Sequence, residues 1–215
     1  IMLSEYTILD FTDDRGEIGP MLLADLGADV IRVELPSGSK ARHSEPLFEG
    51  SPKDIKSLQY AAFNRNKRSI ALDPAIKSDL QVLSDLITKA DFIFESSPSK
   101  TLQAYQIDYA IAKKLNSRII YTRISPFGDK GPHSEYLGND LVVAAMGGPV
   151  ALQGDPGREP IRLSVPQVWR HAGVEAAAGA LAAHARMLKT GESQFVDVSA
   201  QCVMTWTMLN AMDAH

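Results

Sequence analysis

The chain has 215 residues, of which 45% are hydrophobic and 22% are charged, as is typical of a globular protein of one or two domains. The net charge of −4 argues against nucleic acid as the main partner, and no apolar run approaches the length of about 20 residues that a membrane-spanning helix needs. A single cysteine, Cys202, excludes an internal disulfide, and no signal-peptide pattern opens the chain, so we expect a cytoplasmic protein.

Strand and helix patterns alternate along the chain. A β-branched run at 7–11 predicts a buried strand, and Pro20 opens a helix that ends near Gly27, a residue suited to the positive φ found after helices. Later runs predict strands at 30–34, 69–72, 91–95, 118–124 and 194–198. Helical patterns follow from 74 and at 101–105, 109–115, 140–146, 168–187 and 200–213. This alternation indicates an α/β fold with a parallel sheet and flanking helices.

One internal boundary is predicted. Residues 147–160 are rich in turn-forming residues and separate the strand–helix alternation from a long Ala-rich helix. The chain begins at Ile1 and stops at His215 inside a helical pattern that has no Gly or Pro stop signal. We therefore expect residues 1–215 to be the N-terminal part of a longer polypeptide whose C-terminal remainder is absent.

Common nucleotide, metal and nucleophile motifs do not occur. The loop after the first strand lacks Gly-x-Gly-x-x-Gly, so no nicotinamide site is predicted, and the chain has no P-loop motif. The five histidines are scattered without metal-ligand spacing, so no metal site is predicted either. Cys202 lies in an apolar helical stretch, where packing is a simpler role than nucleophilic attack.

The most compact basic segment is 64–68, which includes Lys67 and Arg68. Such residues bind phosphates through charge-assisted hydrogen bonds, so this segment is either an anion clamp or a solvated turn. Arg42, which lies in a long irregular stretch, allows the same two interpretations. The residues alone leave the choice open.

Six stretches together resemble the family III CoA-transferases, which include formyl-CoA transferase, carnitine CoA-transferase and α-methylacyl-CoA racemase. They are 9–12, 19–34, 64–73, 90–95, 124–132 and 190–199. The resemblance spans nearly the whole chain and implies a Rossmann-like large domain in a polypeptide about twice as long. It also implies two interlocked copies in a homodimer, with acyl-CoA and a carboxylic acid as substrates and no metal.

In transferases of this family an aspartate attacks the acyl-CoA thioester and carries covalent intermediates. The family pattern, laid on Val165, Pro166 and Gly173, puts Trp169 at that position. An indole cannot form an acyl anhydride. The chain therefore resembles the family in its scaffold and departs from it at the nucleophile.

Two other carboxylates are candidates for chemistry. Racemases of the family use a His-Asp pair, and here Asn139 replaces the histidine while Asp140 remains. Asn has no titrating nitrogen, so it cannot shuttle protons. Asp140 is the best surviving acid, with a helix N-cap as its alternative role. Glu175 is a weaker candidate, because six helical positions place it about 240° around the helix from Trp169.

The resemblance also implies residues for coenzyme A. Arg42, Lys67, Arg68 and Leu72 match positions that line its nucleotide end. Ser96 is a fifth candidate contact to coenzyme A, at a position where the family has an Asn followed by an aromatic residue.

A second departure precedes the first helix. Asp13, Asp14 and Arg15 replace a loop that is more often small and uncharged in the family. Two acids in this place repel phosphates unless Arg15 or another neighbour pairs with them.

Three functional hypotheses follow. The first is an acyl-CoA:carboxylate CoA-transferase whose nucleophile is not in this segment and comes from another module. The second is a non-catalytic CoA-binding or dimer-forming module of the same family. The third is racemase or dehydratase chemistry at the α-carbon of an acyl-CoA, with Asp140 as base.

Overall fold

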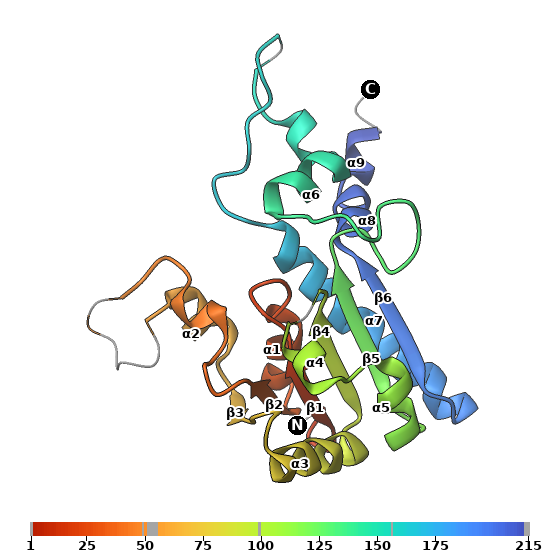
Figure 1. Cartoon of the computed structure of the whole chain (residues 1–215). Helices are drawn as coiled ribbons and strands as arrows, with labels where there is room; N and C mark the ends of the chain where they lie inside the picture. Colours follow the sequence, from red (N-terminus) through yellow and green to blue (C-terminus); the bar gives the residue numbers. More distant parts are fainter. Residues whose placement is uncertain (1, 49, 51–55, 99, 156, 213–215) are drawn as a thin grey trace.

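A computed structural model describes residues 2–48, 50, 56–98, 100–155 and 157–212. Its centre is one sheet of six parallel strands in the order β3-β2-β1-β4-β5-β6 (Figure 1). The strands are β1 (Thr7–Phe11), β2 (Asp29–Glu34), β3 (Lys67–Ala71), β4 (Phe92–Ser96), β5 (Ile120–Ser125) and β6 (Gln194–Ser199). The predicted α/β fold with a parallel sheet is confirmed.

Helices cover both faces of the sheet because neighbouring residues of each central strand point to opposite sides. Ile8 of β1 packs with α1 (Ile18–Asp25) and α7 (Val168–Thr190) in one buried cluster. Leu9 packs with α3 (Lys77–Lys89), α4 (Lys100–Tyr105) and α5 (Tyr109–Leu115) in the other.

The remaining helices lie at the periphery of the sheet. They are η1 (Lys40–His43), α2 (Leu58–Phe63), α6 (Asp140–Gly147), η2 (Pro149–Leu152), α8 (Ala200–Trp206) and α9 (Leu209–Met212). Figure 1 shows the connection between α6 and α7 running away from the sheet. This excursion contains the predicted boundary at 147–160, which stays a prediction.

The bounds of several predicted elements differ from the structure, among them the helix predicted from Pro74, which begins at Lys77. β3 begins at Lys67, two residues earlier than its apolar pattern indicated, because an edge strand tolerates polar side chains. The predicted helix at 200–213 is divided, since α8 ends at Trp206 and α9 starts at Leu209. The predicted end at Asp213 lies outside the described residues. Gly27 has the expected positive φ, at 105°.

α1 and α7 approach each other through glycines. A Cβ atom on Gly173 would lie 2.5 Å from Ile18 Cγ2 and 2.9 Å from the Gly16 carbonyl oxygen. A Cβ atom on Gly19 would lie 2.5 Å from the Gly173 carbonyl oxygen. The contact involves backbone atoms on both sides, so it cannot be relieved by a rotamer change alone.

We predict that Gly173→Ala lowers the free energy of unfolding by about 1–3 kcal/mol through overpacking, as measured by urea denaturation. Gly179→Ala in the same helix is the matched control. Its Cβ would lie 3.1 Å from Val196 Cγ1 alone, and the gain in helix propensity of up to about 1 kcal/mol offsets that contact. Equal losses in the two variants would contradict a specific close approach at Gly173.

Candidate functional site

The sheet order changes direction between β1 and β4, and ligands of open α/β sheets bind beside such a point at the carboxyl ends of the strands. A cavity of about 450 Å³ lies there. Its walls come from the ends of β1 and β2, the loops at 13–15 and 35–40, and the start of α4. We call it the carboxyl-edge crevice. Its volume falls within the usual range of ligand pockets.

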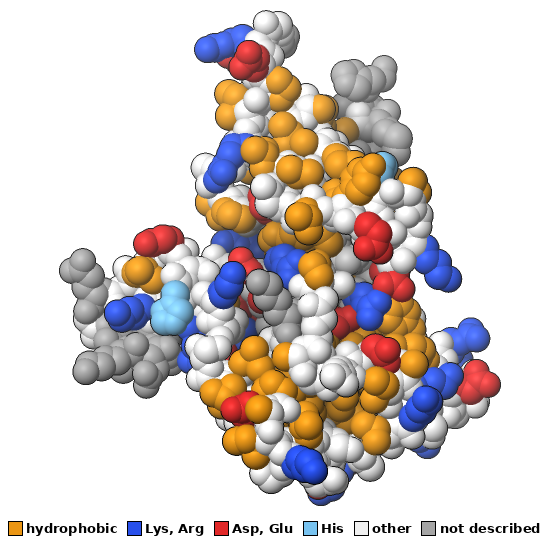
Figure 2. All heavy atoms as spheres, in the orientation of Figure 1, with side chains coloured by type: hydrophobic (Ala, Val, Ile, Leu, Met, Phe, Trp, Pro, Cys, Tyr) orange, Lys and Arg blue, Asp and Glu red, His pale blue; other side chains and the backbone are white. Residues whose placement is uncertain are grey.

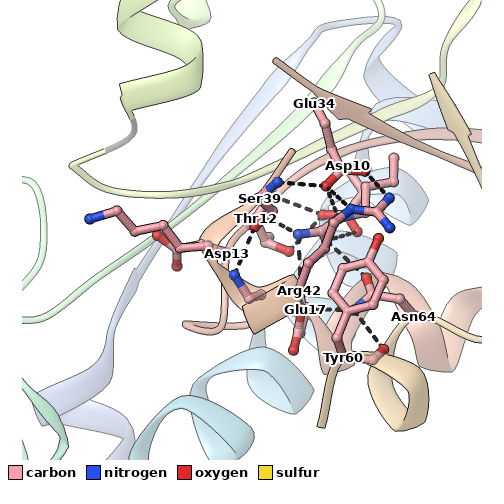
Figure 3. A network of polar contacts seen from close by, with 12 residues as sticks. Asp10, Thr12, Asp13, Glu17, Glu34, Ser39, Arg42, Tyr60 and Asn64 are labelled. Atoms are coloured by element: carbon pink, nitrogen blue, oxygen red, sulfur yellow. Dashed lines mark hydrogen bonds and ion pairs between the residues drawn. The ribbon is translucent and has the colours of Figure 1, made fainter. Parts of the chain in front are cut away.

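A buried ion network adjoins the crevice (Figure 3). Asp10 of β1 is wholly buried, and its Oδ2 accepts hydrogen bonds from Lys67 Nζ at 2.8 Å and from Arg32 Nη1 at 3.2 Å. The side chains of Lys67 and Arg32 are 1% and 2% exposed. Burial raises the pKa of the Asp10 carboxyl, but the attraction of Lys67 and Arg32 is larger in sum and leaves it below its ordinary value.

Asn64 joins the two cations to a second acid. Its Oδ1 accepts hydrogen bonds from Arg32 at 2.9 Å and Lys67 at 3.0 Å, while its Nδ2 donates to Glu17 Oε2 at 2.8 Å. Lys67 also donates to the Glu17 backbone carbonyl at 2.8 Å. The amide of Asn64 therefore links α2, the sheet and the start of α1.

Glu17 is the least satisfied member of the network. Its side chain is 2% exposed, its Oε1 has no hydrogen-bond partner, and Arg32 Nη2 lies 3.9 Å from its Oε2. Burial raises the pKa of Glu17 to about 7, although Arg32 and Asn64 act in the opposite direction. The carboxyl therefore changes protonation near neutral pH.

Glu34 closes the network at the end of β2. Arg42 donates to Glu34 through Nε at 3.0 Å and through Nη2, and its guanidinium lies 4.5 Å from the centre of the Tyr60 ring. Ser39 N also donates to Glu34 at 2.9 Å. The Arg42 hydrogen bond and the attraction of Arg32 outweigh the effect of burial and keep the pKa of Glu34 below its ordinary value.

A second ion pair lies in the crevice wall. Arg15 donates to Asp13 through Nε at 2.9 Å and through Nη2 at 2.7 Å. The same guanidinium donates at 3.0 Å to the carbonyl oxygens of Ser97 and Pro98 after β4. Ser96 Oγ donates to the Arg15 carbonyl at 2.7 Å. The loop after β1 is thus tied across the switch point to the loop after β4.

The predicted CoA residues all have partners within the chain. Lys67 and Arg42 belong to the ion network, and Ser96 holds the Arg15 loop. Arg68 lies on the exposed side of β3 and pairs with Asp29 at 2.6 Å, whereas Leu72 is buried in the core. The structure does not bring these five residues into one site, and their roles with CoA stay predictions.

Two of the predicted catalytic residues come close to each other, because Asp140 bonds to the residue before Trp169 at the start of α7, whereas Glu175 lies further along that helix. Trp169, in the first turn of α7, is 9% exposed and belongs to the core cluster between the sheet and α7. Asp140 Oδ1 accepts a hydrogen bond from Val168 N at 2.9 Å, and Asn139 rather than Asp140 is the N-cap of α6, accepting from Val142 N. Glu175 is exposed and lines a groove between α7, β6 and α8.

The sequence reasoning missed Asp10, Glu17 and Asn64 as a unit. One signal was available, since an acidic residue inside the buried run 7–11 requires a buried cation. Within the described part of the chain, no group of three or more His, Cys, Asp or Glu side chains is arranged to hold a metal ion. No helix in that part is long and apolar enough to cross a membrane.

The family model described as CoA-transferase family III matches residues 3–215, and the chain belongs to that family. Its relatives include subunit BbsE of succinyl-CoA:(R)-benzylsuccinate CoA-transferase from Thauera aromatica, which is 34% identical over 91% of this chain and 48% of that protein. Formyl-CoA:oxalate CoA-transferase from Streptomyces avermitilis is 32% identical over 90% of this chain and 46% of that protein. The chain spans about half the length of these relatives.

Solved structures agree with the family assignment. A CAIB/BAIF family protein from Brucella suis superposes with a TM-score of 0.87 at 30% identity, over 97% of this chain and 56% of that one. Rv3272 from M. tuberculosis gives a TM-score of 0.84 at 29% identity, over 99% of this chain and 59% of that one. The predicted CoA-transferase scaffold is confirmed.

We predict that Lys67→Met and Arg68→Met differ sharply although the two cations are neighbours. Lys67→Met removes a buried partner of Asp10 and lowers the free energy of unfolding by about 3 kcal/mol or more. Arg68→Met removes an exposed pair and costs less than about 1 kcal/mol. Urea denaturation measures both, and a stable Lys67→Met protein would contradict the structural role.

We predict that Glu17 makes the protein less stable as pH rises. The folded-state pKa of about 7 exceeds the ordinary value of 4.5, so the folded state binds more protons between these values. The contribution of protonated Glu17 to the free energy of unfolding is therefore fully present below about pH 4.5. It is lost as pH rises through 7, by about 1–3 kcal/mol.

Glu17→Gln tests this assignment, because the amide keeps an acceptor for Asn64 and cannot ionise. The difference in unfolding free energy between the wild type and Glu17→Gln, measured in urea at pH 5 and pH 8, should move in favour of the variant at pH 8. A difference that does not change with pH would show that Glu17 stays in one protonation state.

Proposed function

We propose that this chain is part of an acyl-CoA:carboxylate CoA-transferase-type protein, in which the reactive carboxylate is supplied by another chain or module of the same fold. Family membership supports CoA transfer between carboxylic acids as the reaction of the whole assembly. The names of relatives such as succinate–glutarate CoA-transferase from Agrobacterium fabrum place dicarboxylates among the substrates to test.

Trp169 is the observation that carries this proposal. The indole N–H is only a donor, so it offers no nucleophilic lone pair to a thioester carbonyl. The side chain is 9% exposed and packs within a core cluster, which leaves little of it accessible to a substrate. A protomer with this residue at the family's aspartate position lacks the group that would form the anhydride.

The other acids do not restore that group in this chain. Asp140 has one carboxylate oxygen bonded to the α7 backbone, a structural role other than the predicted N-cap, which Asn139 fills in α6. Glu175 lines a groove on a different face of α7 from the buried Trp169.

The expected chemistry fixes what a test must detect. A carboxylate oxygen of the enzyme attacks the thioester carbon, the C–S bond breaks, and CoA departs as the thiolate. The acyl group stays bound to the enzyme as an anhydride. Hydroxylamine attacks that anhydride, forms a hydroxamate and regenerates the carboxylate. Radioactive acyl label that stays on protein and is released by hydroxylamine therefore reports an acylated carboxylate.

A non-catalytic module of the same family is the second candidate. The observation in its favour is that all five residues predicted to contact CoA are hydrogen-bonded, ion-paired or buried within the chain. We keep the interlocked homodimer and the cytoplasmic location as predictions for the whole protein.

We predict that this chain acquires no hydroxylamine-labile label from [¹⁴C]succinyl-CoA when the chain or module that carries the aspartate is not present. The succinate–glutarate CoA-transferase of Agrobacterium fabrum, treated identically, is the positive control because succinate, the acid of the labelled acyl group, appears in its name. Stoichiometric labelling of the wild type that disappears in Glu175→Gln or Asp140→Asn would overturn the proposal. Deuterium from solvent at the α-carbon of the acyl group would instead favour racemase chemistry.

A further inference from the structure

The carboxyl-edge crevice has space for a ligand but no surplus of positive charge. Its lining includes three carboxylates (Asp13, Asp14 and Glu34) and three cations (Arg15, Arg32 and Lys40). Figure 2 shows acidic and basic side chains interspersed on the face of the molecule seen there. The 3′-phosphate and diphosphate of CoA carry several negative charges, and such groups are normally bound by unpaired Arg and Lys side chains or by backbone N–H groups.

Two of the three cations already have carboxylate partners. Arg32 is 2% exposed and pairs with Asp10, which lies behind the crevice. Arg15 engages Asp13 through two nitrogens and the Ser97 and Pro98 carbonyls through its other N–H groups. Among the described residues that line the crevice, Lys40 is the cation for which the structure gives no carboxylate partner.

The acids are not equivalent. Glu34 is held by Arg42, and Asp13 is held by Arg15, but Asp14 has no ion pair among the described residues. Partial burial, and then the neighbouring Asp13 carboxylate, raise the pKa of Asp14, while Arg15 acts in the opposite direction. The 13–15 loop therefore presents at least as much negative as positive charge to an incoming phosphate.

The neighbouring cleft, of about 280 Å³, also contains a cation that already has carboxylate partners. It shares Pro98 with the crevice and contains Arg123, which pairs with both Glu95 and Asp129. Burial lowers the pKa of Arg123, but the Glu95 and Asp129 carboxylates outweigh it and raise the pKa overall. A phosphate in either cleft has to displace a carboxylate that is already bonded to the available guanidinium.

We propose that Asp13 and Asp14 are specificity determinants that exclude the nucleotide end of CoA from the carboxyl-edge crevice. Asp13 neutralises Arg15 and fixes it across the switch point, and Asp14 adds a carboxylate that repels phosphate. This inference rests on the proposed function, because it assigns thioester binding in the assembly to the protomer that carries the aspartate. The chain described here then contributes its folded scaffold and a surface that contacts that protomer.

The experiment is a titration of the whole protein with free CoA by isothermal calorimetry. The wild type should bind with a Kd weaker than about 1 mM. Asp13→Asn/Asp14→Asn keeps the side-chain shapes and the turn around Arg15 N, removes two negative charges and releases the guanidinium. We expect this variant to bind CoA at least 10-fold more tightly, with an affinity that falls as salt rises.

Asp25→Asn/Asp29→Asn is the matched control. It makes the same change in net charge and releases Arg65 and Arg68, which lie on an exposed surface away from the crevice. We expect these two substitutions not to increase the affinity for CoA. Adding Arg15→Gln to Asp13→Asn/Asp14→Asn should remove the gain, and Asp13→Asn alone provides a milder variant if the double variant melts at a lower temperature.

Three outcomes would overturn the inference. They are micromolar binding of CoA to the wild type, an unchanged affinity in Asp13→Asn/Asp14→Asn, or an equal gain in the control pair. None of them decides the proposed function, which is judged by hydroxylamine-labile label on the protein. A wild type that binds CoA tightly without becoming acylated would remove this inference and leave the missing nucleophile in place.

Discussion

The structure depends on the burial of one carboxylate, Asp10, at the carboxyl end of a central strand. A charged group without solvent is costly unless it is paired and hydrogen-bonded, and here one cation comes from β2 and another from β3. Asn64 bonds to both cations and passes the linkage to Glu17 at the start of α1. Three strands and two helices are thereby fixed relative to one another, and the cations that do this have no free charge to offer a ligand.

This constraint explains which parts of the molecule the sequence could predict. Strands and helices follow from local periodicity, so the order of elements and the parallel sheet could be predicted from alternation alone. The ends of elements depended on context. β3 begins with Lys67 because that side chain reaches Asp10, and its polar start looks like a loop when read locally. The break between α8 and α9 has no Gly or Pro to announce it.

The roles of the basic residues could not be predicted for a different reason. A cation binds phosphate only if it is not already paired, and its partner can lie far away in sequence. Lys67 pairs with Asp10 across 57 positions, whereas Arg15 pairs with Asp13 two positions away. The sequence indicated that Arg15 could pair with Asp13 and so reduce the repulsion between the two aspartates and a phosphate. It gave no comparable indication that Lys67 pairs with Asp10. A family motif names candidate positions, but it does not show whether the side chains there are available to a ligand.

The two departures from the family pattern that we propose lie in different parts of the molecule and have the same expected consequence. At the start of α7, Trp169, for which we propose the nucleophile position, buries a large apolar surface, which stabilises the core where a lone buried carboxylate would cost free energy. At the carboxyl edge, Asp13 and Asp14 offset the positive charge that a nucleotide needs. A chain under selection for its own catalysis would be expected to keep at least one of these features. Loss of both, with the sheet and the α1–α7 contact present, is what our proposal expects of a protomer that assembles with a catalytic partner.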